Sequence, residues 1–110
     1  MDFSINQKNE TRFIYILPFK SKEALIEFTL FSKSVLKKSE YEKVLKQYLA
    51  NKGINSYKIL EKEKGIIPMT CYPFEKHNSE RVLFIGTAGG WTKASSGYTF
   101  KNIINKTELL

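Results

Sequence analysis

The residues best suited to chemistry in this sequence are a cluster of glycines near its C-terminal end. Gly86, Gly89 and Gly90 are separated only by the small residues Thr87 and Ala88. A segment with so little side chain lets the backbone approach a ligand closely and present N–H groups to it. A phosphate group is the ligand that such N–H groups favour, especially beside a helix N-terminus. An ordinary strand-to-helix turn that needs positive φ would use the same glycines.

The segments on either side of the glycines predict a strand and a helix. Residues 82–85 are Val-Leu-Phe-Ile, an apolar run typical of a buried strand. Gly97 and Tyr98 lead into Phe100, Ile103 and Ile104, which have the spacing of the inward-facing stripe of a helix. We therefore expect a helix that begins near Gly97 and whose N-terminus faces the glycine cluster.

Glu27 is the second candidate for chemistry. Residues 24–31 alternate as a strand, which places Ile26 and Phe28 on one face and Glu27 with Leu25 on the other. A carboxylate among apolar neighbours is costly unless it is paired, solvated in a cleft or kept protonated. The pattern fits a catalytic acid and, equally well, a surface glutamate on an edge strand.

Other strands should position Glu27. The alternating residues 1–5 predict an edge strand, and the continuous apolar run 13–17 predicts a central strand with both faces covered, ended by Pro18. The short segment 20–23 predicts a hairpin to the strand that carries Glu27. A further half-buried strand is expected at 54–64, so the sheet should have about four or five strands.

One amphipathic helix is expected over this sheet, at about 40–51. Ser39 and Glu42 have the spacing of a capping box, and Gly53 provides the stop. The inner face of this helix should carry Tyr41, Val44, Leu45, Tyr48 and Leu49. The sequence therefore predicts an α+β fold: an antiparallel sheet covered by an amphipathic helix, with a C-terminal strand, glycine turn and helix.

Composition limits the classes of partner. The 110 residues carry 18 basic and 11 acidic side chains, a formal charge of +7, which favours an anionic partner. The lysines are scattered, so we expect no specific nucleic-acid site. The single cysteine, Cys71, excludes an intrachain disulfide and a cysteine-cluster metal site. We expect Cys71 to be a small buried residue. We expect His77 to be exposed. No metal site is predicted.

Several short motifs, in order along nearly the whole chain, resemble the C-terminal half of the lycopene cyclase family. The most specific is the last, which runs from the glycine cluster to Phe100. The motifs are Met1-Asp2-Phe3, Ile16-Leu17-Pro18, Ala24-Leu25-Ile26-Glu27-Phe28-Thr29, Ile67-Pro68-Met69-Thr70, Gly86-Thr87-Ala88-Gly89-Gly90 and Ser96-Gly97-Tyr98-Thr99-Phe100.

The resemblance implies a two-domain flavoprotein of the glutathione-reductase/hydroxylase type that closes linear carotenes into rings. Such enzymes use reduced FAD without net redox change, in the manner of an isomerase, and act as peripheral membrane proteins. Residues 1–80 would belong to the substrate-domain sheet and 81–110 to a flavin-contacting segment, in which residues 86–90, Gly97 and Tyr98 approach the cofactor. Glu27 would take the place of an acid that protonates the substrate or stabilises the carbocation, whereas the second acidic position of that motif is Phe28.

No G-x-G-x-x-G motif lies near the N-terminus, so the segment that would bind the adenosine and pyrophosphate of FAD is missing from these residues. We therefore expect a fragment that is inactive alone and that carries flavin-contacting residues without binding flavin by itself. A non-functional remnant of the family would in addition expose apolar surface and self-associate. Its expected setting is cytoplasmic, at a membrane surface. The alternative is a small basic module that binds a nucleotide, a nucleic acid or an acidic membrane.

Overall fold

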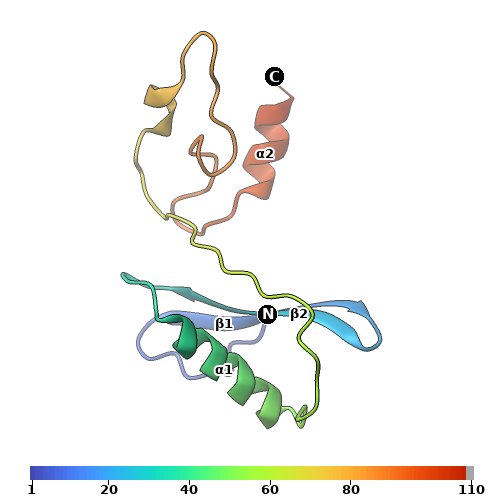
Figure 1. Cartoon of the computed structure of the whole chain (residues 1–110). Coiled ribbons are helices and arrows are strands. Elements are labelled where there is room, and N and C mark those ends of the chain that lie inside the picture. Colours follow the sequence, from blue (N-terminus) through green and yellow to red (C-terminus); the bar gives the residue numbers. More distant parts are fainter. Residues whose placement is uncertain (109–110) are drawn as a thin grey trace. The chain divides into compact units, whose positions relative to one another are not determined.

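The computed structural model describes residues 1–108 and divides into two units, Met1–Leu60 and Glu61–Leu110 (Figure 1). Leu109 and Leu110, the last residues of the expected 81–110 segment, lie outside the described residues. The elements are β1 (Thr11–Lys20), β2 (Glu23–Phe31) and α1 (Lys38–Asn51) in the first unit, and the 3₁₀ turn η1 (Phe74–His77) and α2 (Phe100–Thr107) in the second. The α+β class is confirmed, with two strands among the described residues.

The β1–β2 hairpin forms as predicted, with antiparallel pairs that include Ile14 with Phe28 and Tyr15 with Glu27. The prediction that Pro18 ends the first strand is wrong, because Pro18 pairs with Ala24 and β1 continues to Lys20. A proline is tolerated at the edge of a sheet, where no neighbouring strand needs its missing N–H. The register shifts between Pro18 and Lys20, which leaves Phe19 without a strand partner.

The predicted edge strand at 1–5 is reduced to a single bridge. The backbone of Asp2 exchanges two hydrogen bonds with Ile14, at 2.8 and 2.9 Å. The chain then turns away into the loop before β1, where Lys8 and Asn9 have positive φ. Strand pairing beyond Asp2 is lost to this loop.

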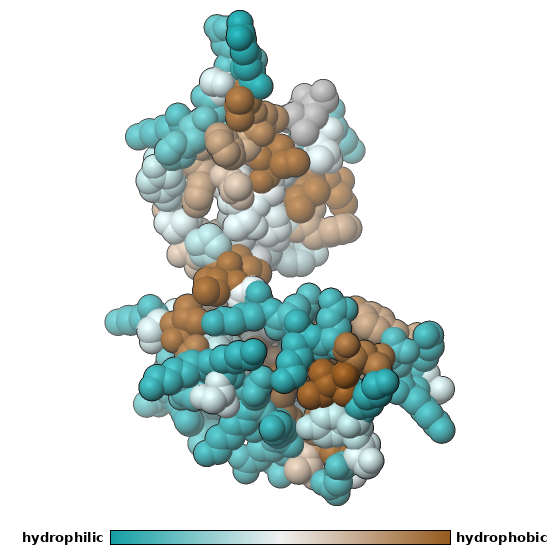
Figure 2. Space-filling view, viewed as in Figure 1, coloured by the Kyte–Doolittle hydropathy of each residue, from teal (hydrophilic) through white to brown (hydrophobic). Residues whose placement is uncertain are grey.

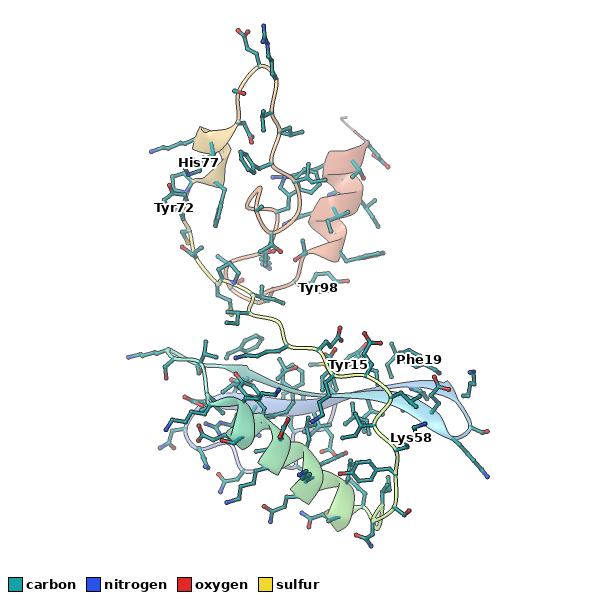
Figure 3. All side chains as sticks on the ribbon, in the orientation of Figure 1. Tyr15, Phe19, Lys58, Tyr72, His77 and Tyr98 are labelled. Carbon is teal, nitrogen blue, oxygen red and sulfur yellow. The ribbon has the colours of Figure 1, made fainter. Side chains whose placement is uncertain are left out.

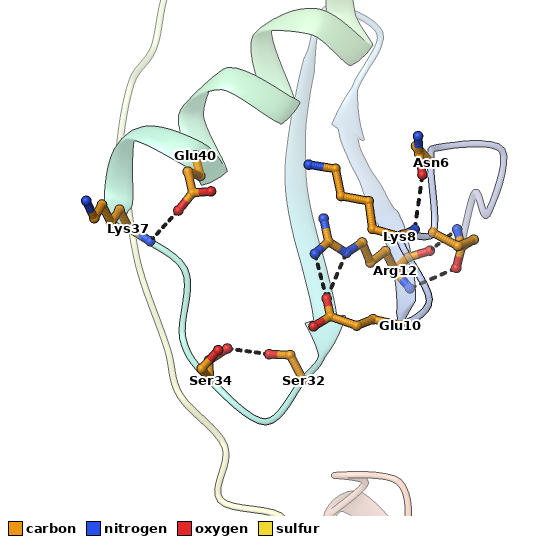
Figure 4. Close-up of polar contacts among 9 residues, drawn as sticks. Asn6, Lys8, Glu10, Arg12, Ser32, Ser34, Lys37 and Glu40 are labelled. Atoms are coloured by element: carbon orange, nitrogen blue, oxygen red, sulfur yellow. Dashed lines mark hydrogen bonds and ion pairs between the residues drawn. The ribbon is translucent and has the colours of Figure 1, made fainter.

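Polar contacts close that loop onto the start of β1 (Figure 4). The backbone N–H of Arg12 donates to Gln7 Oε1 at 2.9 Å, and Gln7 Nε2 donates to the carbonyl of Arg12 at 2.8 Å. The guanidinium of Arg12, a residue only 6% exposed, pairs with the carboxylate of Glu10 through Nε at 2.9 Å. The buried cation is thereby paired, as a buried charge must be.

Helix α1 covers one face of the hairpin, as predicted. Ile14 is fully buried against Phe28 and Tyr48, which are 7% and 6% exposed. Partly buried side chains complete this core: Ile5, Ile26, Leu30, Leu36, Tyr41, Val44 and Leu45. The apolar stripe of α1 therefore stabilises the unit by burial against β1 and β2.

The ends of α1 were predicted with partial success. The helix begins at Lys38, and the backbone N–H of Lys37 donates to the Glu40 carboxylate at 3.0 Å (Figure 4). The predicted capping box of Ser39 and Glu42 is therefore wrong, because Glu40 caps the helix two residues earlier. Gly53, with φ +76°, follows the last turn, and its N–H donates to the Ala50 carbonyl, which confirms the predicted stop.

The prediction that 13–17 is covered on both faces holds only at its start. Phe13 is buried on the face away from α1 by the rings of Phe3 and Phe31, at centroid distances of 5.2 and 6.2 Å. Tyr15 and Leu17 remain 38% and 41% exposed. No second layer of the Met1–Leu60 unit covers this part of the sheet.

Two expectations for the chain after α1 are wrong. Residues 54–64 form no strand, and residues 82–85 form no strand. Residues 82–85 remain 40–55% exposed, with only an isolated bridge between Ser79 and Val82. The propensities are those of strands, but the described residues offer these segments no neighbouring strand with which to pair.

Hydrophobic surface is accordingly extensive. Figure 2 shows brown patches over the Glu61–Leu110 unit, whereas the surface around α1 is mainly hydrophilic. The large apolar side chains exposed in the second unit are Ile66, Ile67, Met69, Tyr72, Val82, Leu83, Phe84, Ile85, Tyr98, Phe100, Ile103 and Ile104. An apolar area of this kind marks a surface available for interaction.

Candidate functional site

The glycine cluster forms a tight turn that its own backbone closes. The N–H of Trp91 donates to the carbonyl of Gly86 at 2.9 Å, and the N–H of Gly90 donates to the carbonyl of Thr87 at 3.1 Å. The N–H of Gly89 lies 3.1 Å from the Ile85 carbonyl oxygen. These three N–H groups serve the turn and are not free for a ligand.

The three glycines of the turn are required for different reasons. At Gly89 an added Cβ would overlap the backbone carbonyl of Phe84, and at Gly90 it would lie 3.0 Å from the Phe74 ring. Gly86 and Gly90 also have positive φ, +59° and +71°, which side chains disfavour. At Gly86, however, an added Cβ would meet no atom within 4 Å. The backbone is therefore open to approach at Gly86 only.

Two backbone donors beside Gly86 are available. Among residues 1–108, no group accepts a hydrogen bond from the N–H of Thr87 or of Ala88, and both residues are exposed. An open glycine with two adjacent free N–H groups fits an anionic or carbonyl oxygen of a ligand. The residues present therefore fit one contact to a phosphate or flavin oxygen, although most donors of the predicted phosphate seat are used internally.

Side-chain hydrogen bonds tie this turn to α2. Thr92 Oγ1 lies 3.3 Å from Thr87 Oγ1 and 2.9 Å from the Oγ1 of Thr99, the residue before α2. Asn102 Nδ2, in the first turn of the helix, donates to the Trp91 carbonyl at 2.6 Å. The prediction that the helix N-terminus lies beside the glycine turn is thus confirmed.

Gly97 and Tyr98 lie in a second turn that leads into this helix. Gly97 has φ +68°, and its N–H donates to the Lys93 carbonyl at 2.8 Å. The helix begins at Phe100, slightly later than expected, and its apolar stripe is exposed rather than inward-facing. The Tyr98 side chain is 59% exposed. It is available to a ligand or to another surface.

Trp91 is buried, whereas Cys71 is exposed. Trp91 is 6% exposed, and Lys106 Nζ lies 5.6 Å from its ring centroid, so its environment is built from within the unit. Cys71 is exposed, and the expectation of a small buried residue is wrong because the segment around it has no core to enter.

His77 is exposed, as predicted, but it has a partner that the sequence did not reveal. Tyr72 Oη lies 2.8 Å from His77 Nε2, and the two rings stack at 5.7 Å (Figure 3). The 3₁₀ turn η1 after Pro73 produces this pairing. The only available signal was the proline itself, which indicates a turn without saying which side chains meet.

Glu27 lies on the sheet face away from α1. It is half-buried and stands opposite Tyr15, next to the pair formed by Leu17 and Leu25. Alternation along β2 predicted this face correctly, because Phe28 points into the core beneath α1. Glu27 belongs to the Met1–Leu60 unit and the glycine turn to the other, so each part of the candidate site is described within its own unit.

One polar cluster in the first unit was missed altogether. The Asp2 carboxylate accepts hydrogen bonds from the Ser4 N–H at 2.8 Å and from Tyr48 Oη at 2.7 Å, and it lies 3.3 Å from Lys52 Nζ. The Ser4 and Tyr48 hydrogen bonds hold the pKa of Asp2 well below its ordinary value. The hydrogen bond to Asp2 in turn raises the pKa of Tyr48 and that of Lys52. The cluster fastens the N-terminus to the end of α1.

The fold and site define an α+β protein that carries a glycine turn beside a short helix and a half-buried glutamate on an apolar sheet face. The family model described as lycopene cyclase protein matches residues 1–110. The chain therefore belongs to the lycopene cyclase family, as its motifs indicated.

A curated relative agrees with this assignment. Neoxanthin synthase, chloroplastic, from Solanum tuberosum is 32% identical over 95 residues, which cover 86% of this chain and 19% of the relative. The chain thus spans about a fifth of the length of the relative that it matches. No solved structure matches the chain.

Proposed function

We propose that this chain is a portion of a flavin-dependent lycopene cyclase, in which it contributes Glu27 to ring closure and the glycine turn to flavin contact. The observation that carries the proposal is the family match over residues 1–110. The open backbone at Gly86, beside the free N–H groups of Thr87 and Ala88, supports the cofactor part of it.

The chemistry proposed for Glu27 is proton transfer to a linear carotene end group. A proton adds to a terminal double bond, the resulting carbocation is attacked by a neighbouring double bond to close the ring, and loss of a proton gives an isomer of the starting carotene. Such a step needs a positioned acid and electron-rich surroundings in a dry site. Glu27 supplies the acidic group, half-buried opposite Tyr15 on an apolar face.

Lycopene cyclase family proteins are generally FAD-dependent, and the residues proposed to hold the flavin here lie in the turn and just before α2. They are Gly86, Thr87, Ala88, Gly89, Gly90, Gly97 and Tyr98. When bound, reduced FAD would supply electron density that stabilises the cationic intermediate. Gly89 and Gly90 shape the turn, whereas Gly86, Thr87 and Ala88 face the space a ligand can reach.

The setting we propose is a cytoplasmic membrane surface, because a linear carotene dissolves in the bilayer. No helix among residues 1–108 is long and apolar enough to cross a membrane. The printed name of the potato relative calls that protein chloroplastic. For this chain alone we propose no catalysis, and self-association through the exposed apolar side chains of the second unit, which sedimentation velocity would detect.

A chimera tests the catalytic proposal. The chain replaces the matching segment of a functional lycopene cyclase, and ring-bearing carotenes are measured by chromatography in cells that accumulate lycopene. Glu27→Gln keeps the size of the side chain but removes its acidity, and we expect about 100-fold less product, the scale of a lost general acid. Glu63→Gln, at an exposed position, is the matched control and should retain activity.

Two further measurements make the chimera experiment decisive. Equal protein yield and equal flavin content for the Glu27 and Glu63 variants would show that both fold. Full cyclisation by the folded Glu27→Gln variant would overturn the catalytic assignment. For the cofactor, Gly86→Val should lower the flavin content of the purified chimera, while Gly65→Val, a glycine in open space without positive φ, should not.

A further inference from the structure

The tip of the β1–β2 hairpin is the most exposed apolar part of the sheet. Along the face of β1 away from α1, exposure rises from 7% at Phe13 through 38% at Tyr15 and 41% at Leu17 to 58% at Phe19. Figure 3 shows Tyr15 and Phe19 on the same side of the sheet, opposite α1. The apolar row on this face is therefore most exposed to solvent at the hairpin tip.

The backbone accounts for the projection of Phe19. It has no partner in the strand register, which shifts between Pro18 and Lys20. Irregularities of this kind re-aim a side chain instead of pairing it. A phenylalanine left unpaired and exposed at a hairpin tip contributes nothing to the core beneath α1, so its solvent exposure needs another explanation.

Basic side chains flank this aromatic tip. Lys20 has 74% of its side chain exposed, and Lys22 is exposed in the turn. Glu23 contacts Lys20 at 3.2 Å, but an exposed pair of this kind is weak and leaves Lys20 able to meet another anion. Glu27, the other acidic group on this side of the sheet, lies farther back, opposite Tyr15. The tip thus combines an exposed aromatic ring with two exposed cations.

We infer that the hairpin tip is the contact of this chain with an anionic lipid bilayer. Phe19 and Leu17 enter the interfacial region, where aromatic and aliphatic side chains leave water, while Lys20 and Lys22 extend to the acidic headgroups. Each lysine close to such a surface strengthens binding about fivefold. The chain's charge of +7 favours the same partner. The proposed function includes a peripheral membrane contact, and this inference assigns that contact to the β1–β2 hairpin. It rests on the membrane contact of the proposed function and not on its catalytic part.

Co-sedimentation of the full chain with vesicles tests the contact. Vesicles of phosphatidylcholine with phosphatidylserine are compared with vesicles of phosphatidylcholine alone. The chain should bind the anionic vesicles, and Phe19→Ser should weaken that binding about tenfold, because it removes a side chain worth more than one decade when buried. Phe19→Trp should bind at least as well as the unaltered chain. Lys20→Ala with Lys22→Ala should weaken binding about 25-fold at low salt and much less at high salt.

Matched controls separate this contact from general charge or hydrophobicity. Lys43→Ala with Lys46→Ala removes two exposed lysines from α1, and Tyr57→Ser removes an aromatic residue that is 46% exposed elsewhere in the same unit. Both should bind as the unaltered chain does, and circular dichroism should show that all variants keep their fold. Vesicle binding that is indifferent to the hairpin variants would overturn the hairpin assignment and leave the membrane contact standing.

Two other outcomes would also overturn the assignment. Absence of binding to anionic vesicles by the unaltered chain would contradict the membrane contact altogether, without bearing on cyclisation by the chimera. Salt-sensitive binding to RNA that depends on Lys20 and Lys22 but not on Phe19, with no vesicle binding, would assign the tip to a nucleic acid.

Discussion

The substitution Gly89→Ala should lower the denaturant concentration at which the Glu61–Leu110 unit unfolds. The Cβ of Gly89→Ala would overlap the carbonyl of Phe84, and backbone atoms cannot move aside as a flexible side chain can. The Gly89 N–H also bonds to the carbonyls of Ile85 and Gly86 at 3.1 and 3.2 Å, and relief of the overlap would stretch both contacts. Overpacking costs about 1–3 kcal/mol and a weakened hydrogen bond about 1 kcal/mol, so we expect a loss of about 2–4 kcal/mol.

Trp91 supplies the assay. It is the sole tryptophan of the chain and 6% exposed, so its fluorescence reports the unfolding of this unit in urea. Gly65→Ala is the matched control, because an added Cβ there meets nothing within 4 Å and the backbone has no positive φ. It should be neutral or stabilise by about 0.4–1 kcal/mol. Gly86→Ala, with positive φ but open space, should lie between them at a cost of about 1–2 kcal/mol.

The order of the three unfolding midpoints decides whether this reasoning is right. The highest midpoint should belong to Gly65→Ala, the next to Gly86→Ala and the lowest to Gly89→Ala. A Gly89→Ala chain that unfolds at the same urea concentration as the Gly65→Ala chain would refute the close packing of the turn against Phe84.

Three further predictions concern the Met1–Leu60 unit. Phe28→Ala should cost about 3–5 kcal/mol of stability, because Phe28 is 7% exposed in the core beneath α1, as urea unfolding followed by circular dichroism will show. Glu40→Ala should cost about 1 kcal/mol in the same assay, because it leaves the Lys37 N–H without its cap. The pKa of Asp2 is lowered in the folded chain by hydrogen bonds from Ser4 and then Tyr48, so its stabilising effect is complete at neutral pH and declines as the pH falls below the ordinary pKa of about 4. Asp2→Asn should remove this acid-dependent decline in thermal stability.

The sequence predicted best where local pattern and burial agree within one unit. The alternation of 24–31 gave the correct faces of β2, because the residues that face α1 are all apolar. The stripe of α1 and its stop at Gly53 were equally clear. The N-terminal cap of α1 was harder to predict. Glu40 follows Lys37 and Glu42 follows Ser39 at the same spacing of three residues, so local spacing alone does not choose between the two pairs.

Prediction failed where structure depends on a partner rather than on local propensity. Residues 54–64 and 82–85 have the composition of strands, but a strand needs a neighbouring strand, and among residues 1–108 only the isolated bridge between Ser79 and Val82 involves them. The apolar stripe of α2 is a similar case, because it was expected to face inward and it is exposed. Composition indicates that a segment should be buried, and it does not specify what buries it.

The candidate site shows the same division. The glycines of the turn and the nearby helix N-terminus follow from spacing, whereas the different roles of Gly86 and Gly89 depend on where the Phe84 carbonyl lies. The hydrogen bonds of Thr92 to Thr87 and Thr99 link residues several positions apart through two turns. Sequence patterns of period two or 3.6 do not report such contacts. The contribution of each candidate residue to catalysis or cofactor binding stays a prediction.

The central claim is that this chain serves flavin-dependent cyclisation without net redox change. The most direct measurement is anaerobic conversion of lycopene by the purified chimera, with the flavin oxidation state followed by absorbance while ring-bearing products are counted by chromatography. We predict that rings form only when reduced FAD is present and that the flavin is still reduced after many turnovers. Ring formation at the same rate without flavin, or oxidation of one flavin for each ring formed, would contradict the claim.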